Sequence, residues 1–528
     1  MLQLDPGRPT DAVSTERRYL EMATNTTRKR GTAEASTGLL KGSIRFLTIV
    51  LMVTAAAAPL VVVSTYIPIS YAYGSGFSTA LTYAAATIIL LVFSVGFAQM
   101  AKRITASGAF YNFTTQGLGK PVGLGAGWTI MVAYSMIVPA ISGGLGFYLS
   151  SLLDKYLGWS VPWWICSIVG VALMWLLSYF KVTMAGRVLG VALGLEIIII
   201  FIVALLTVVK GGSEGQMPEA FNPATFVAAP AIGIGLFFAF WSWIGFETTA
   251  IYGEETSDPK RAVPRATYIA VITLGVFYTF VAYAGIVGFG KDTVKQAQEL
   301  GANYFFEMAG RFAGLFFQDV LDFLVVTSFF ACAFAFHNNA SRYLFSMGRD
   351  HILPASLGRT HPVHRSPYVA NAVQGIVAIV VIALFALAGA DPLLQLGGWL
   401  PIFCTAGVVF VQLLVSIAVI RYFNRVGRSG PGEVWKTLIA PVIGVLAQAG
   451  VLVLLIIYIP FLAGADVLVV NLIPLYVALI GIAGVAFALY LRRRSPERYA
   501  RIGKIYDEEE QPDALAVPLV ERDPEPTA

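Results

Sequence analysis

The chain has 528 residues, of which 57% are hydrophobic and only 13% are charged. Its mean hydropathy is +0.72, whereas soluble domains carry roughly 25% charged residues. This composition excludes an ordinary soluble protein. Apolar runs of about 20 residues, long enough to cross a bilayer, recur along the chain and predict a polytopic, all-α membrane protein. Membrane β-barrels show shorter segments of alternating polarity instead.

Twelve segments have the length and apolar character of membrane-spanning helices, and the even number places both termini on one side. The expected spans cover residues 44–72, 78–101, 122–151, 161–179, 183–209, 230–254, 265–289, 315–345, 368–389, 394–421, 436–461 and 467–491. Together they form a predicted bundle over residues 44–491. The polar segments 1–43 and 492–528 flank this bundle, and we expect them to be largely disordered tails.

Lysine and arginine residues are distributed unevenly between the predicted loops. If both termini are inside the cell, 31 of the 36 lie on the cytoplasmic side. Only Lys155, Lys210, Lys291, Lys295 and Arg311 lie on the other side. The positive-inside rule therefore predicts a multi-pass protein of the plasma membrane with both termini cytoplasmic. The formal charge of +5 reflects this topology and the anionic lipid headgroups, and does not indicate nucleic-acid binding.

Two of the predicted spans are interrupted. The first span contains "LMVTAAAAPLVVV", where Pro59 cannot donate a backbone hydrogen bond and should break the helix near Ala55–Ala58. The sixth contains "SWIGFE", where Gly245 interrupts the apolar run. Each begins a set of five spans, the spacing expected of a five-plus-five inverted repeat. Paired interruptions of this kind indicate a transporter site, although each alone could be a simple kink.

Unwound backbone at membrane depth has a specific chemistry. The N-termini of half-helices attract carboxylates, and exposed carbonyl groups attract ammonium groups. The two interruptions therefore predict a site that holds a zwitterion or an amine by its backbone, with side chains that set the selectivity.

The sixth span and the loop after it, "GFETTAIYGEETSDPKRAVPRA", resemble the signature of the amino acid–polyamine–organocation (APC) permeases. "LMVTAAAAPL", "AKRITASGAFYNFTTQGLGKPVG" and "SRYLFSMGRDHILP" agree with it, and the resemblance covers about residues 44–490. It implies a LeuT-like fold with discontinuous first and sixth helices. The family usually has a Gly-Ser-Gly turn in the first break, where this chain has Ala58-Pro59-Leu60. Because proline removes a donor, this departure favours a substrate without a carboxylate, such as an amine or a polyamine.

Three titratable residues are candidates for proton coupling. Glu247 follows the second break, as in some relatives with a coupling glutamate, and could carry a proton or stabilise the second half-helix. Glu196 lies mid-span, where relatives have a coupling lysine, and is either a coupling group or a structural carboxyl. His337 is either a proton relay or, more in keeping with its polar neighbours, part of a hydrogen-bonded inner gate.

The resemblance places a gating aromatic at Trp241, which could close over a bound cation. The alternative is ordinary packing, which we favour for Trp243. The full set of expected substrate-binding residues is Ala55, Ala56, Ala57, Ala58, Pro59, Tyr134, Trp241, Ser242, Trp243, Gly245, Phe246 and Phe336.

A mixed-charge cluster at the inner end of the sixth span could form a cytoplasmic gate, paired with basic residues after the eighth span. The alternative is a solvated, capped loop. The cluster consists of Glu254, Glu255, Asp258, Lys260, Arg261 and Arg265.

No metal site, cofactor or enzymatic activity is expected. His361 and His364 lack a third ligand, and the chain has no Walker A or metalloprotease motif. The sequence therefore predicts a secondary active transporter for an amino acid or a related amine, with proton-coupled uptake by alternating access. An exchanger and a polyamine permease are the alternatives, and a membrane sensor without transport is a further class.

Overall fold

The computed structural model describes residues 39, 42 and 44–505 except 181, 230, 429, 465 and 466, and it omits the side chains of residues 182–189. Eleven helical segments in this part of the chain are long and apolar enough to cross a membrane. The fourth predicted span appears as α8 (Trp163–Tyr179), which is apolar but has only 17 residues. The all-helical, polytopic architecture is confirmed, while the count of twelve full-length spans and the inverted repeat remain predictions.

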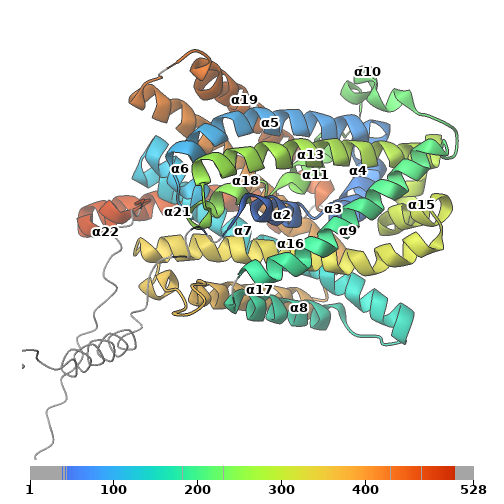
Figure 1. Cartoon of the computed structure of the whole chain (residues 1–528), viewed down its shortest axis with the longest axis horizontal. Coiled ribbons are helices and arrows are strands. Elements are labelled where there is room, and N and C mark those ends of the chain that lie inside the picture. The colour runs from blue at the N-terminus through green and yellow to red at the C-terminus, as the bar shows by residue number, and fades with distance from the viewer. Residues whose placement is uncertain are drawn as a thin grey trace, which may run out of the picture.

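The long helices run side by side along the longest dimension of the molecule (Figure 1). Those outside the two interrupted spans are α5 (Thr79–Arg103), α7 (Lys120–Leu157), α9 (Val182–Val209), α13 (Pro259–Phe289), α16 (Leu315–Arg349), α17 (Tyr368–Leu387), α18 (Gly397–Val426), α19 (Ala440–Leu462) and α21 (Ile473–Arg494). Shorter helices between or beyond them include α6 (Ala109–Leu118), α10 (Pro223–Val227), α14 (Thr293–Leu300), α15 (Tyr304–Phe312) and α22 (Pro496–Arg501).

The ends of α7 illustrate how local sequence delimits these helices. Gly119 precedes it with a φ of +96°, and Pro121 stands in the first turn, where its missing N–H has no partner to lose. The helix ends at Gly158, which has a left-handed conformation and donates to the carbonyl of Asp154. Because α7 has 38 residues, it extends about 57 Å at 1.5 Å per residue, well beyond the hydrocarbon core.

The two interrupted spans lie at the centre of the bundle. In the most apolar stretch of the sixth span, 89% of the residues are buried, compared with 28% for α19 and 22% for α21. The α19 and α21 faces that remain uncovered carry leucine, isoleucine and valine side chains, as expected of surfaces in contact with lipid. α13 packs along α5, and α16 and α21 pack along α7, so these helices surround the centre.

Both predicted breaks are confirmed. The first span consists of α2 (Phe46–Ala57), α3 (Pro59–Val61), a π-helical turn η1 (Val62–Tyr66) and α4 (Ile67–Tyr73). Ala58 separates α2 from α3 and has left-handed φ and ψ of 44° and 72°. The sixth span consists of α11 (Ile232–Trp243) and α12 (Thr248–Ile251), and Gly245 between them has a φ of +110°. That φ is readily accessible only to glycine.

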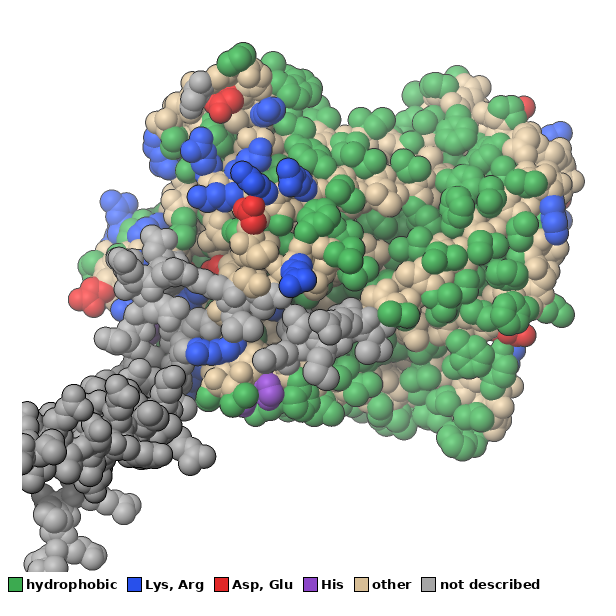
Figure 2. All heavy atoms as spheres, in the orientation of Figure 1, with side chains coloured by type: hydrophobic (Ala, Val, Ile, Leu, Met, Phe, Trp, Pro, Cys, Tyr) green, Lys and Arg blue, Asp and Glu red, His purple; other side chains and the backbone are tan. Residues whose placement is uncertain are grey.

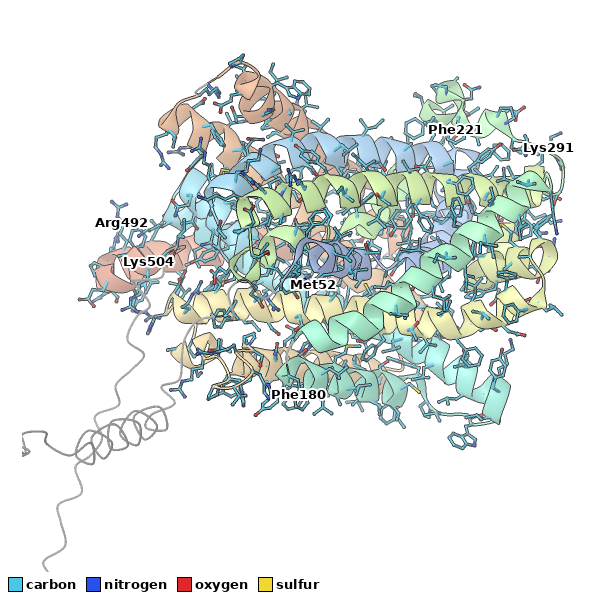
Figure 3. The ribbon with its side chains drawn as sticks, viewed as in Figure 1. Met52, Phe180, Phe221, Lys291, Arg492 and Lys504 are labelled. Carbon is cyan, nitrogen blue, oxygen red and sulfur yellow. The ribbon has the colours of Figure 1, made fainter. Side chains whose placement is uncertain are left out.

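The two ends of the bundle differ in charge. Lys and Arg side chains gather at one end, and the flanks are mostly hydrophobic (Figure 2). Arg492 and Lys504 lie at this basic end, and Lys291 and Phe221 lie at the opposite end (Figure 3). The predicted boundary of the C-terminal tail at residue 492 falls inside α21, and α22 follows. The expected disorder of residues 1–38 and 506–528 concerns segments outside the described residues.

Candidate functional site

The two helix breaks touch each other. A Cβ atom added to Gly245 would lie 2.7 Å from the Cβ of Ala56 and 3.0 Å from the Cζ of Phe336. α12 also packs against α2, and η1 packs against α11. The absence of a side chain at Gly245 therefore allows the backbone of the sixth span to approach the first span and α16 closely.

A small cavity lies at this junction. Six of the predicted substrate-binding residues line it, namely Ala56, Ala57, Ala58, Trp241, Ser242 and Phe336. The sequence interpretation missed the other lining residues, which are Val61, Val62, Tyr66, Ile141, Ile244 and Cys332. Helical spacing alone could have suggested Val61 and Val62, because they follow the break within one turn. The lining carries no charged side chain, and it is largely apolar.

The remaining predicted residues occupy positions around this cavity. Ala55 lines a second cavity, between α2, α9, α12 and α16. Pro59 is buried at the start of α3, and Trp243 packs against Tyr278, with ring centroids 5.7 Å apart. Phe246 packs edge to face against phenylalanines of α5, so its side chain does not line the cavity.

Glu196 is bound to the break in the first span. Its Oε1 accepts a hydrogen bond from the Leu60 amide at 2.5 Å and from the Ser328 hydroxyl at 2.9 Å. The Leu60 amide needs such a partner because the left-handed Ala58 ends the helical ladder before it. A carboxyl in the middle of α9, only 1% exposed, is thereby joined to α3 and α16.

The carbonyl groups of the same break have partners as well. The Ala56 carbonyl accepts a hydrogen bond from the Cys332 thiol at 3.2 Å. The Ala57 carbonyl accepts one from the Tyr278 hydroxyl at 2.8 Å. Each carbonyl oxygen retains a second lone pair that could accept a further hydrogen bond.

Glu247 is bound to the break in the sixth span. One carboxyl oxygen accepts from the Gly245 amide at 3.1 Å, and the other accepts from the Tyr134 hydroxyl. The carboxyl is fully buried. Next to it, the Asn339 side-chain amide donates to the Thr248 hydroxyl at 2.8 Å. Glu247 thus stabilises the irregular backbone between α11 and α12 and connects it to α7 through Tyr134.

His337 has a different environment from either carboxyl. Its ring is completely buried, and neither ring nitrogen has a hydrogen-bond partner among the described residues. The hydrogen-bonded inner gate expected from its polar neighbours is therefore wrong for this residue. Asn338 and Asn339, which follow it, donate instead to the Phe334 carbonyl and to Thr248.

Aromatic rings cover two sides of the cavity. Trp241 meets Tyr66 edge to face with centroids 6.1 Å apart, and Tyr66 stacks on Phe238 at 5.9 Å. On the other side Phe336 meets Tyr134 at 5.4 Å. Trp241 and Phe336 come from the sixth span and from α16, so a relative movement of these elements would change the shape of the cavity.

A sequence profile of amino acid permeases matches residues 44–505. The chain belongs to the amino acid permease family. It is 24% identical over 360 residues to the branched-chain amino acid permease BcaP of Bacillus subtilis (strain 168), covering 64% of this chain and 72% of that protein. It is 25% identical over 366 residues to the low-affinity putrescine importer PlaP of Escherichia coli (strain K12), covering 68% and 78%. The predicted APC superfamily membership is confirmed, and the protein is a multi-pass amino acid or amine permease.

Two of the predicted gate residues form buried ion pairs in the permease. Arg342 donates to Glu255 at 2.8 Å, and its guanidinium lies 3.9 Å from the ring centre of Tyr252. Arg349 donates twice to Glu254, at 2.7 and 3.0 Å. These pairs join the end of the sixth span to α16 and support the predicted pairing with basic residues of that helix.

Glu254 lies beyond Ile251, the last residue of the sixth span. Burial alone would raise the pKa of this carboxyl, but the charge and hydrogen bonds of Arg349 and the amide of Ser107 outweigh burial and hold the pKa below its usual value. The carboxyl therefore stays ionised at physiological pH, and the ion pair is maintained.

The other predicted gate residues are not part of this buried network. Asp258 and Arg261 form a 3.9 Å pair in which both side chains are more than half exposed. Lys260 and Arg265 are also exposed. The exposure of these four residues agrees with the solvated alternative, but Lys260, Arg261 and Arg265 lie in the first turns of α13 rather than in a loop, and the Asp258 side chain makes no capping hydrogen bond. Ile44, just before α2, joins the segment after the sixth span through a bridge with Thr256.

The described part of the permease contains no cluster of three or more His, Cys, Asp or Glu residues suited to a metal. His361 and His364 stack on each other at 4.7 Å, and His361 hydrogen-bonds to the Tyr179 hydroxyl at 2.9 Å. Cys166, Cys332 and Cys404 are buried free thiols.

Proposed function

We propose that this permease takes up an amino acid or a related amine together with protons, and that the substrate binds in the cavity between the two helix breaks. The observation that carries this proposal is the contact between Gly245 and Ala56 beside a cavity lined by both breaks. In secondary transporters of this architecture, substrate sites lie where discontinuous helices meet near the membrane midplane.

Alternating access would require the two sides of the cavity to open in turn. The buried pairs Arg342–Glu255 and Arg349–Glu254 fasten the sixth span to α16 at one end, so we assign them to the closed cytoplasmic gate. Trp241 and Phe336 are positioned to cover the substrate. Separation of the ion pairs and rotation of the central helices would then release it into the cell.

Proton coupling is assigned to Glu247, with Glu196 as a second candidate. Both carboxyls are buried and lie within candidate membrane spans, where an ionised carboxylate is unfavourable unless it is compensated. Glu247 contacts the backbone of one break and Glu196 that of the other. Loss or gain of a proton by either carboxyl would therefore change the strength of its hydrogen bond to the backbone of the break.

The proposed location is the plasma membrane with both termini cytoplasmic. This orientation places the basic end of the bundle, where Arg492 and Lys504 lie (Figure 3), against the cytoplasmic leaflet. Lys and Arg side chains near that leaflet interact favourably with anionic headgroups.

The test is uptake of radiolabelled substrate into proteoliposomes with an imposed pH gradient. Inward-directed protons should accelerate uptake, and a proton ionophore should abolish accumulation. If uptake proceeds equally without any ion gradient and requires substrate on the other side, the protein is an exchanger. Binding without any movement of substrate would instead support the sensor alternative.

A further inference from the structure

The chain continues past the last membrane-spanning helix and returns to the bundle, where α22 lies at the basic end (Figure 1). After α22, Ile502 is only 1% exposed and belongs to the hydrophobic core. Gly503 is also buried and has a φ of +62°, and a Cβ atom added there would lie 2.6 Å from the Thr115 Cγ2 atom of α6. We call residues 496–505 the C-terminal strap. Its end is inserted between other elements of the bundle.

Hydrogen bonds fix the strap to two neighbouring elements. The Lys120 side chain, at the start of α7, donates to the Ala500 carbonyl at 2.5 Å. The Arg498 guanidinium donates twice to the carbonyl of His351, just after α16, at 2.9 and 2.7 Å. The strap therefore connects the cytoplasmic ends of two long helices that are far apart in the sequence.

A buried contact at the end of the strap centres on the Gly503 amide. This amide donates to the Asp350 carboxyl group at 2.9 Å and to the Tyr111 hydroxyl at 2.7 Å. The Tyr111 hydroxyl in turn donates to the same oxygen of Asp350 at 2.7 Å. Tyr111 belongs to α6 and Asp350 follows α16, and both residues are buried. We call these three residues the buried triangle, and it joins α6 to the end of α16.

The same two elements hold the carboxyl group of the gate residue Glu254. Arg349, adjacent to Asp350, donates two hydrogen bonds to it. The amide of Ser107, two residues before the start of α6, donates a third at 2.9 Å. Both donors reach Glu254 only while α6 and the end of α16 keep their relative position. The buried triangle fixes that position.

We propose that the C-terminal strap is a regulatory element that keeps the cytoplasmic gate closed by positioning the two donors of Glu254. This inference rests on the proposed function, because the assignment of the gate belongs to it. When the strap withdraws, α6 and the end of α16 lose the Gly503 amide as a shared partner. Glu254 is then released more readily, and the cavity opens more often toward the cytoplasm.

The native thiol of Cys332 gives a direct readout of this opening, because it lines the cavity between the helix breaks. In inside-out membrane vesicles, a membrane-impermeant maleimide reaches Cys332 through the cytoplasmic gate. Cys404 serves as an internal control for general unfolding. It is buried, donates to the Ala133 carbonyl at 3.3 Å, and is not among the residues that line the cavity. Mass spectrometry of the digested protein gives the labelling rate of each thiol.

Gly503→Ala should displace the end of the strap, because the added methyl group collides with Thr115. Gly427→Ala is the matched control, since Gly427 has a φ of +92° but an added Cβ has no atom within 4 Å. Gly503→Ala should accelerate labelling of Cys332 at least about tenfold, the factor for loss of a hydrogen bond to a charged group. Gly427→Ala should not, and Cys404 should react equally slowly in both. Equal Cys332 rates in the two variants, or a joint rise for Cys332 and Cys404, would overturn the proposal.

Tyr111→Phe tests the same contact if Gly503→Ala does not fold. It keeps the aromatic ring but removes the hydroxyl through which α6 joins the buried triangle. Labelling of Cys332 should again accelerate while that of Cys404 does not. A wild-type rate for Cys332 in this variant would reject the role of the triangle in holding the gate.

Glu254→Gln separates this inference from the proposed function, because it weakens the gate contact itself. If Glu254→Gln accelerates labelling of Cys332 and Gly503→Ala does not, the gate assignment stands and the strap is rejected. If Glu254→Gln has no effect, the gate assignment fails, and with it the proposed action of the strap. Failure of the wild-type protein to take up substrate would reject the transport proposal without altering the comparison of labelling rates.

Discussion

Gly245→Ala is the substitution that tests most directly whether the two helix breaks meet. The new methyl group would lie 2.7 Å from the Ala56 Cβ, well inside van der Waals contact. Such overpacking destabilises a folded protein by about 1–3 kcal/mol. Alanine at a φ of +110° adds roughly 1–3 kcal/mol of backbone strain. We therefore expect a total loss of about 2–6 kcal/mol in the free energy of unfolding.

A matched control separates the two contributions. Gly119 also has a positive φ, of +96°, but an added Cβ there has no atom within 4 Å. Gly119→Ala should therefore show only the backbone strain. Ala56→Gly removes the methyl group that Gly245→Ala would strike, so the two substitutions should couple by about 1–3 kcal/mol in a double-mutant cycle.

Thermal unfolding of the purified protein in detergent measures all four variants. Two results together would refute the close approach of the breaks. Gly245→Ala and Gly119→Ala would lower the melting temperature equally, and the effects of Gly245→Ala and Ala56→Gly would be additive. Uptake should fall with Gly245→Ala even in the fraction that remains folded, because the cavity lies at the same junction.

Three further predictions concern Glu247, Trp241 and the Arg342–Glu255 ion pair. Glu247→Gln should leave protein abundance near normal but flatten the pH dependence of uptake. A pH profile identical to that of the wild type would restrict Glu247 to a structural role. Trp241→Ala should raise the half-saturation concentration for uptake with little change in melting temperature; the reverse pattern would indicate that Trp241 only packs. Arg342→Ala leaves Glu255 buried and unpaired, which should destabilise the protein by about 3–5 kcal/mol. Adding Glu255→Ala to Arg342→Ala should recover part of this loss. If the single and the double variant had the same free energy of unfolding, the pairing would be contradicted.

The sequence predicted those features that depend on a few adjacent residues. Pro59 cannot continue a helix, and Gly245 can adopt a φ that other residues avoid. Both breaks could therefore be placed to within a few residues. Span lengths and charge asymmetry are likewise local properties. The limits of α7 were underestimated because the bilayer sets a minimum length for a span but no maximum.

Contacts between distant segments could not be predicted from the sequence. Glu196 and Leu60 are 136 residues apart, and no pattern around either indicates that they pair. The same holds for Tyr134 with Glu247 and for Arg342 with Glu255. His337 was misjudged for a related reason: its neighbours in sequence are polar, but on α16 they point toward different partners.

The pairing of each carboxyl with one break bears on how the two breaks are stabilised. Unpaired amides in a membrane are costly, so broken helices that rely on a substrate for their hydrogen bonds are poorly satisfied without it. Here Glu196 and Glu247 supply such bonds to the amides of Leu60 and Gly245. These two amides therefore have their partners within the protein, and the two carboxyls tie the irregular backbone of the breaks to the surrounding helices through Ser328 and Tyr134.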